Sequence, residues 1–128
     1  SCSVVSNHLA NNEQTKGMLT GSLFSSMPPY SVFLNTGRGA QVVESELADV
    51  LEAHPDLTAI LDVTEPEPPL PDSRFYTLEN CILTPHIAGS SGNEVHRMAE
   101  YMADEFSLYI SGAKTKYEVT HKMLETMA

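Results

Sequence analysis

An arginine, a glutamate and a histidine, residue types that often act in catalysis, each follow a short apolar run of this sequence. Arg38 follows the run at 32–34, His86 follows the run at 81–83, and Glu67 lies between them. A guanidinium is costly to bury without an anion, so an arginine flanked by glycines at the end of a buried strand indicates an anionic ligand. A carboxylate beside a histidine stabilises the protonated ring, so such a pair could move a proton. Together these groups suit a small 2-oxo or 2-hydroxy acid, with hydride passing to a carrier that the protein itself cannot supply.

Each of these residues also has a purely structural interpretation. Arg38 could cap a turn or pair with a carboxylate, and His86 could hydrogen-bond its own turn. Glu67 could be solvated among its prolines, and Asp62, at the end of an apolar run, could cap a turn. The repeated pattern favours chemistry, because each apolar run delivers an ionisable group just past its end. If the runs are parallel strands, those ends share one edge of a sheet, where open α/β sheets bind ligands.

The spacing of apolar residues predicts the elements that would carry these groups. A strand, a helix and a second strand at this spacing form a crossover, which forces parallel pairing. Expected strands cover 4–9, 32–35, 58–62 and 81–86, and expected helices cover 20–27 and 44–53. We therefore expect an α/β fold: a partial Rossmann-like parallel sheet of about four strands, with flanking helices and a long C-terminal helix.

The long helix is expected after Gly89. Ser91 and Glu94 have the spacing of a capping box, and an apolar stripe at helical spacing runs as far as Gly112. The stripe predicts a helix face that is buried in the core. It consists of Val95, Met98, Ala99, Met102, Ala103, Phe106 and Ile110. Upstream, the prolines between 63 and 81 exclude a helix, and a connection of that length predicts a functional loop.

The composition narrows the classes of partner. A formal net charge of −10 over 128 residues argues against nucleic acid and anionic membranes. Cys2 and Cys81 lie far apart, and no histidine or cysteine spacing suggests a metal site, so we expect free thiols and no metal. No apolar run is long enough to span a membrane and no leader is evident, which favours a cytoplasmic protein. Because the chain starts at Ser1 rather than at a methionine, we expect a fragment, a processed chain or a trimmed one.

Three motifs resemble the signatures of one protein family. They are N-T-G-R-G at 35–39, L-D-V-T-E-P-E-P at 61–68 and T-P-H-I-A-G at 84–89. In order and spacing they resemble those of the D-isomer-specific 2-hydroxyacid dehydrogenases. V-V-S-N-H-L, followed by E-Q-T-K-G-M-L, is similar to the preceding family segment. The resemblance runs from about Ser3 to Gly112, and three linked motifs at matching separations make it specific.

The resemblance implies a role for each candidate residue. It implies a catalytic set of Arg38, Glu67 and His86 acting on a small 2-hydroxy or 2-oxo acid. It implies NAD as cofactor, with Asp62 meeting the nicotinamide carboxamide. The implied dinucleotide contacts fall at or near His8, Thr36, Gly37, Arg38, Asp62, His86, Ala88 and Gly89. Ala10 is a departure, since the family usually has proline there.

The family pattern is matched only in part, because no G-x-G-x-x-G occurs in the 128 residues. The resemblance implies that 1–112 is the C-terminal half of a dinucleotide-binding domain and that 113–128 is a tail leading toward a substrate domain. We expect such a piece to bind NAD weakly and to turn over nothing by itself. Its strand at 4–9 would be an unpaired edge, so we expect a homodimer or other self-association through it. The alternative is a non-enzymatic relative that senses a dinucleotide and acts through protein partners, as a co-repressor does.

Overall fold

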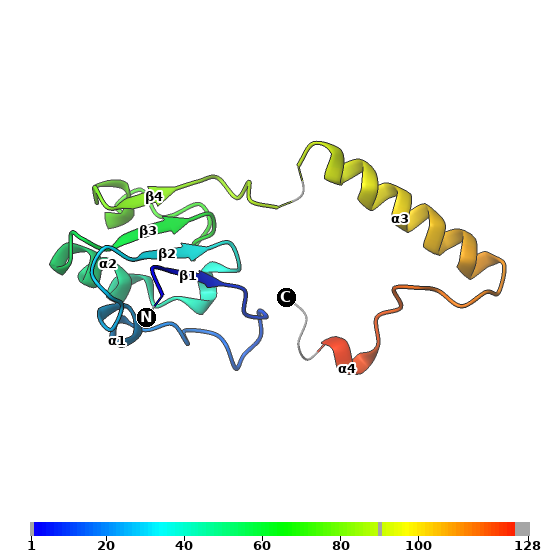
Figure 1. Cartoon of the computed structure of the whole chain (residues 1–128), viewed down its shortest axis with the longest axis horizontal. Helices are drawn as coiled ribbons and strands as arrows, with labels where there is room; N and C mark the ends of the chain where they lie inside the picture. The colour runs from blue at the N-terminus through cyan, green and yellow to red at the C-terminus, as the bar shows by residue number, and fades with distance from the viewer. Residues whose placement is uncertain (1, 90, 125–128) are drawn as a thin grey trace. The chain divides into compact units, whose positions relative to one another are not determined.

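A single parallel sheet organises the first part of the molecule (Figure 1). The computed structural model describes residues 2–89 and 91–124, which fall into two compact units that meet between His86 and Ile87. The sheet has four strands in the order β1-β2-β3-β4, and all neighbouring pairs are parallel. The strands are β1 (Val4–Asn7), β2 (Val32–Asn35), β3 (Thr58–Leu61) and β4 (Cys81–Leu83). The predicted α/β fold with a parallel Rossmann-like sheet is therefore confirmed.

Backbone hydrogen bonds continue past the ends of the strands and align the segments that follow them. The N–H of Asp62 donates to the carbonyl of Asn35 over 2.9 Å, and the N–H of His86 donates to the carbonyl of Asp62 over 3.1 Å. Thr84 N–H likewise donates to the Leu61 carbonyl over 3.0 Å. The chain directly after β2, β3 and β4 is thus tied together at the carboxyl edge of the sheet, as parallel pairing requires.

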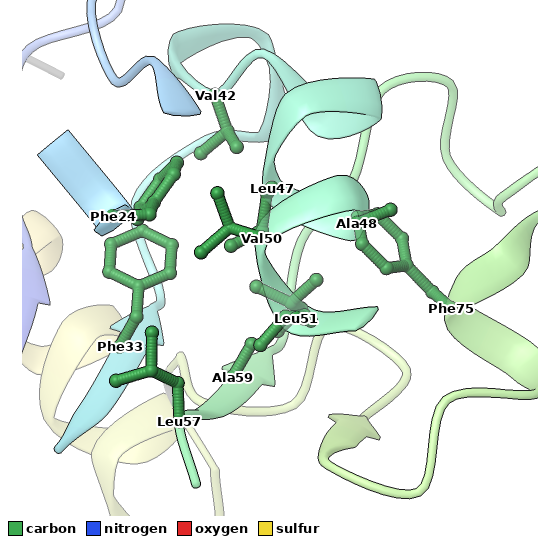
Figure 2. Packing of buried hydrophobic residues seen from close by; sticks show 11 residues of the cluster. Phe24, Phe33, Val42, Leu47, Ala48, Val50, Leu51, Leu57, Ala59 and Phe75 are labelled. Atoms are coloured by element: carbon green, nitrogen blue, oxygen red, sulfur yellow. The ribbon is translucent and has the colours of Figure 1, made fainter. Parts of the chain in front are cut away.

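Two short helices cover the sheet with apolar side chains (Figure 2). Helix α2 (Glu44–Ala53) places Leu47, Val50 and Leu51 on one buried face, and it ends just before Pro55. Helix α1 (Gly21–Ser25) contributes Phe24, whose ring meets that of Phe33 edge-on at 4.8 Å. The remaining members of the core include Val42, Ala48, Leu57, Ala59, Leu61 and Phe75. Both helices agree with the predicted ranges to within two residues.

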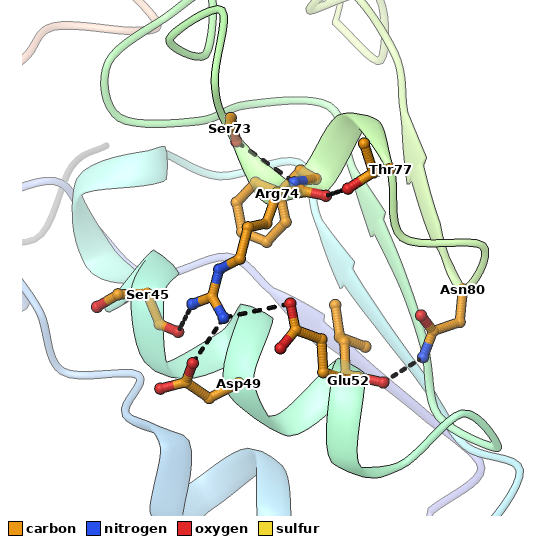
Figure 3. Close-up of polar contacts among 9 residues, drawn as sticks. Ser45, Asp49, Glu52, Ser73, Arg74, Thr77 and Asn80 are labelled. Carbon is orange, nitrogen blue, oxygen red and sulfur yellow. Dashed lines mark hydrogen bonds and ion pairs between the residues drawn. The ribbon is translucent and has the colours of Figure 1, made fainter.

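The proline-rich connection between β3 and β4 is held against α2 by polar contacts (Figure 3). It contains a short 3-10 helix, η2 (Arg74–Tyr76), so the prediction that no helix occurs between 63 and 81 was wrong there. Ser73 caps this turn by accepting from the N–H of Phe75, and the prolines all lie before it. Arg74 reaches Asp49 of α2 at 2.7 Å and the carbonyl of Ser45 at 2.8 Å. The peptide bonds before Pro66 and Pro68 are cis.

The second unit contains the predicted long helix, α3 (Asn93–Ile110), and a short α4 (His121–Leu124) that was not predicted. The capping box was wrong: the N-cap is Gly92 in a left-handed conformation, with φ 55°, and the Glu94 carboxylate pairs with Arg97 at 2.6 Å instead. The predicted burial of the apolar stripe was also wrong. Val95, Met98, Met102, Phe106 and Ile110 are all more than half exposed, because the described residues of this unit form no sheet or second long helix that could cover them. None of the helices in the described part of the chain is long and apolar enough to cross a membrane.

Candidate functional site

The side chains of His86 and Glu67 meet at the carboxyl edge of the sheet. Nδ1 of His86 lies 2.7 Å from Oε1 of Glu67, and both side chains are close to half exposed. The two residues come from the loops after β4 and β3, and the sequence pattern placed them at the same edge. The ring is therefore oriented by a carboxylate and still open to a small molecule, an arrangement that suits proton transfer.

The backbone at His86 is unusual and firmly held. Its φ of 52° lies in the left-handed region, which histidine tolerates better than most residues. Its N–H lies within hydrogen-bond distance of the carbonyls of both Asp62 and Thr84, at 3.1 and 3.0 Å. Strained backbone of this kind gathers at sites where a side chain must be aimed. Here it aims the imidazole at Glu67.

An open hollow of about 410 Å³ adjoins this pair. Its walls are mostly apolar, and Asp62 and Thr84 provide polar groups beside His86 and Glu67. Asp62 is almost completely buried, and its Oδ1 accepts a short hydrogen bond from the Thr84 hydroxyl. The other lining residues are Thr64, Pro68, Pro69, Tyr76, Leu83 and Pro85. The hollow can take a small acid or a single ring, but it is too small for a whole dinucleotide.

Arg38 lies at the same edge but does not line this hollow. It follows β2, its side chain is exposed, and one guanidinium nitrogen donates to the carbonyl of Gly37 over 2.7 Å. The next residue, Gly39, packs so closely on the loop after β3 that an added Cβ would lie 2.0 Å from the carbonyl carbon of Thr64. The backbone around Arg38 is thus fixed beside the loop that carries Glu67, while its guanidinium rests on its own main chain.

The implied cofactor residues fall into two groups. His8 follows β1, with its Nε2 2.8 Å from the hydroxyl of Ser6. Thr36 and Gly37 follow β2, so these three lie at the carboxyl edge of the sheet with Asp62. Ala88 and Gly89 belong to the second unit, and their dinucleotide contacts stay a prediction. The roles of all the candidate residues likewise stay predictions here.

Sequence reasoning missed three buried amides beneath these loops. Asn7, Asn35 and Gln41 are each at most 4% exposed, and Asn7 donates hydrogen bonds to both of the others; we call them the amide triad. Asn7 and Asn35 are register partners that end β1 and β2. The sequence signal for this pair is that two apolar strands, which are neighbours in the sheet, each end in an asparagine. Asparagine at the end of a strand ordinarily indicates a turn, so the signal did not predict a buried pair.

Burial raises the pKa of two ionisable groups near the site, Glu44 and Cys81. Oε1 of Glu44 accepts from the N–H of Glu65 over 2.8 Å, at the start of the loop that carries Glu67. Burial raises the pKa of Glu44, and the hydrogen bond from Glu65 opposes that shift with a smaller effect. Burial, with the Glu44 charge adding to it, raises the pKa of the Cys81 thiol to about 11. Cys81 is therefore a neutral packing residue, not a nucleophile.

Among the described residues, no group of three or more histidine, cysteine, aspartate or glutamate side chains could hold a metal ion.

A parallel sheet with helices packed on it defines a Rossmann-like α/β protein, and the histidine–carboxylate pair lies at the carboxyl edge where such sheets bind ligands. The family model described as D-isomer specific 2-hydroxyacid dehydrogenase, NAD binding domain, matches residues 1–88. The chain belongs to this family.

Named relatives agree with this assignment. The chain is 37% identical over 100 residues to an (S)-sulfolactate dehydrogenase of Chromohalobacter salexigens, covering 78% of this chain and 32% of that one. It is 29% identical over 125 residues to a D-3-phosphoglycerate dehydrogenase of Archaeoglobus fulgidus, covering 98% and 24%. The solved NADPH-dependent glyoxylate/hydroxypyruvate reductase of Sinorhizobium meliloti, in complex with NADP and sulfate, superposes with a TM-score of 0.80 at 30% identity, covering 95% of this chain and 39% of that one. The chain spans about a quarter to a third of the length of the curated relatives it matches.

Proposed function

We propose that these residues form part of a dehydrogenase that interconverts a small D-2-hydroxy acid and the matching 2-oxo acid with a nicotinamide dinucleotide. The observation that carries the proposal is the 2.7 Å contact between Nδ1 of His86 and Oε1 of Glu67, beside an open hollow. A carboxylate on Nδ1 orients the ring so that Nε2 faces the substrate. Membership of the family supports the reaction class.

Each side chain has a stated task in this reaction. When bound, the dinucleotide supplies the hydride that reduces the carbonyl carbon. His86 gives the proton from Nε2 to the carbonyl oxygen as that oxygen becomes a hydroxyl, and Glu67 stabilises the protonated ring beforehand. Arg38 turns from the Gly37 carbonyl to grip the substrate carboxylate with its planar fork. In the oxidative direction the same groups act in reverse order.

The residues present fit the nicotinamide end of a dinucleotide better than its phosphates. The hollow beside Asp62 has the size and the apolar walls that a nicotinamide ring needs, with a buried carboxylate to receive a carboxamide N–H. The glycine-rich loop that would cradle the pyrophosphate does not occur in these 128 residues. We therefore propose weak dinucleotide binding and no turnover by the 128 residues alone. Micromolar affinity for NAD or NADP by calorimetry would contradict this.

The reaction is tested by assaying the full-length protein that carries these residues. Reduction of glyoxylate, hydroxypyruvate, 2-ketogluconate and 3-phosphohydroxypyruvate is followed with NADH and with NADPH. We expect turnover of at least one acid, and the ratio of the two rates decides between the two dinucleotides. Tight dinucleotide binding with no turnover of any acid would contradict the proposal and support the co-repressor-like alternative.

We also propose that the 128 residues self-associate through the outer edge of β1. In the described part of the chain β1 pairs with β2 alone, and its residues Val4 and Val5, whose side chains point to opposite faces of the sheet, are 56% and 42% exposed. An apolar hollow of about 430 Å³ lies beside Val5 and extends to Leu23 and Phe24. Unpaired apolar strand edges recruit a second strand.

Sedimentation analysis tests the association directly. We expect the 128-residue chain to form dimers that dissociate in a Val5→Lys variant, because a charge on an edge strand opposes pairing. Thr77→Lys, on the exposed surface after η2, is the matched control and leaves the dimer intact. A monodisperse monomer for the unmodified chain would overturn this part of the proposal.

A further inference from the structure

The amide triad is bonded to the two loops that carry four of the candidate site residues. On one side, Nε2 of Gln41 donates to the carbonyls of Leu9 and Ala10 at 2.7 and 3.0 Å, next to His8. On the other side, Asn35 bonds to the loop of Thr36, Gly37 and Arg38. Asn7 joins the two sides by donating to both Asn35 and Gln41. The triad therefore lies between two segments that are about thirty residues apart in sequence.

Asn35 holds both residues that determine where the guanidinium of Arg38 lies. Its Oδ1 accepts from the N–H of Gly37 over 3.1 Å, and its Nδ2 donates to the carbonyl of Arg38 over 3.3 Å. The guanidinium in turn donates to the carbonyl of Gly37 over 2.7 Å. Asn35 thus fixes the backbone on both sides of the peptide bond between Gly37 and Arg38, and the arginine side chain reaches out from this backbone when it leaves the Gly37 carbonyl.

Gly37 has no room for a side chain on the side that faces the triad. A Cβ added there would lie 2.9 Å from Nδ2 of Asn7 and 3.1 Å from Oε1 of Gln41. The glycine backbone is therefore packed directly on the amides that hold it. Because the contact is close-packed, a displacement of any of the three amide side chains would also displace the loop that carries Arg38.

We propose that Asn35, supported by Asn7 and Gln41, is a positioning residue for Arg38. This inference rests on the proposed function, in which Arg38 grips the substrate carboxylate. The buried amides set the height of the arginine loop above the sheet edge, so the guanidinium reaches the acid at the right distance from His86. Small errors in such placement are costly, since about 1 Å of misplacement can lower a rate about 100-fold.

A double-mutant cycle in the full-length protein separates positioning from a general effect on stability. The cycle combines Asn35→Ala with Arg38→Ala, and kcat/KM for hydroxypyruvate is measured at saturating dinucleotide. We expect Asn35→Ala to lower kcat/KM about 10- to 100-fold, mainly through KM. In the Arg38→Ala background the same change should cost less than about 2-fold, because there is no guanidinium left to position.

Asn80 provides the matched control. Asn80, labelled in Figure 3, lies just before β4 and so at the opposite end of the sheet. Its Nδ2 donates to the carbonyls of Leu51, His54 and Leu57. Asn80→Ala removes three side-chain hydrogen bonds that are at most partly buried and lie away from the arginine loop, and its effect should be equal in both backgrounds. If Asn35→Ala does not fold, Asn35→Ser, which leaves a smaller cavity, replaces it in the cycle.

The outcomes distinguish this inference from the function on which it rests. A loss in Arg38→Ala with an equal Asn35 effect in both backgrounds would overturn the positioning role and leave the proposed reaction standing. An Arg38→Ala protein with unchanged kcat/KM would overturn both the grip of Arg38 on the acid and the role of Asn35.

Discussion

At the scale of single residues, the Glu67–His86 pair contributes little to the stability of the fold. Both side chains are nearly half exposed, at 42% and 47%, and exposed ion pairs contribute about 0–1 kcal/mol to folding. The left-handed backbone at His86 has a cost rather than a benefit for folding. Geometry that the fold does not need for stability supports the proposed proton-transfer role of this pair.

The first prediction concerns the charge of Glu67, which we expect to affect the rate much more than the stability. Glu67→Gln in the full-length protein should lower kcat by about 10- to 1,000-fold, because the protonated ring loses its stabilising charge. The free energy of unfolding should change by less than about 1 kcal/mol. Initial rates and urea unfolding measure the two effects, with Glu79→Gln as an exposed control. Unchanged kcat in Glu67→Gln would show that the pair is structural.

A second residue-scale prediction concerns Cys81 and alkaline pH. The folded-state pKa, about 11, is raised above the ordinary value of 9.0, so the fold disfavours the thiolate. The stability contributed by the neutral thiol is complete below pH 9 and is lost as the pH rises through about 11. We expect the stability difference between the unmodified chain and Cys81→Ala to shrink over that window, measured by urea unfolding.

Alkylation gives an independent check of the same shift. At pH 8 iodoacetamide should modify the exposed Cys2 well before Cys81 in the folded chain. In urea the two should react at similar rates. Fast modification of Cys81 in the folded chain, followed by mass spectrometry, would contradict the assigned burial.

At the scale of elements, the parallel strands and the loops after them determine the site. Apolar runs between turn residues were enough to predict all four strands, and the period of Leu47, Val50 and Leu51 was enough to predict α2. The Glu67–His86 contact followed from the rule that parallel strands end together. The amide triad was not predictable, since its bonds depend on side-chain geometry between residues about thirty positions apart. The apolar stripe on α3 was predicted to be buried but is exposed. The periodicity of a sequence reveals an apolar helix face but does not show whether another element covers it.

The third prediction tests the close contact between two of these loops. Gly39→Ala would put a methyl group 2.0 Å from the backbone of Thr64, so the loop after β2 must separate from the loop after β3. We expect a loss of about 1–3 kcal/mol in the free energy of unfolding. Gly89→Ala, which meets nothing within 4 Å, is the control and should change stability by less than about 0.5 kcal/mol. Equal stability of the two variants in thermal or urea unfolding would contradict this packing.

At the scale of the whole molecule, the chain combines a sheet unit that carries the site with a helical unit whose apolar stripe is exposed. It belongs to the D-isomer-specific 2-hydroxyacid dehydrogenases and spans about a quarter to a third of its curated relatives. The absence of a G-x-G-x-x-G motif from the 128 residues accounts for the weak dinucleotide binding that we propose.

The central claim is that His86 moves the substrate proton, and replacement of its ring tests this most directly. In the full-length protein, kcat for the preferred 2-oxo acid is compared between the unmodified enzyme, His86→Ala and the surface control His54→Ala, and dinucleotide affinity is measured by calorimetry. We expect a loss of at least about 100-fold in kcat for His86→Ala alone, with dinucleotide binding retained. A His86→Ala enzyme that keeps its full kcat would contradict this claim.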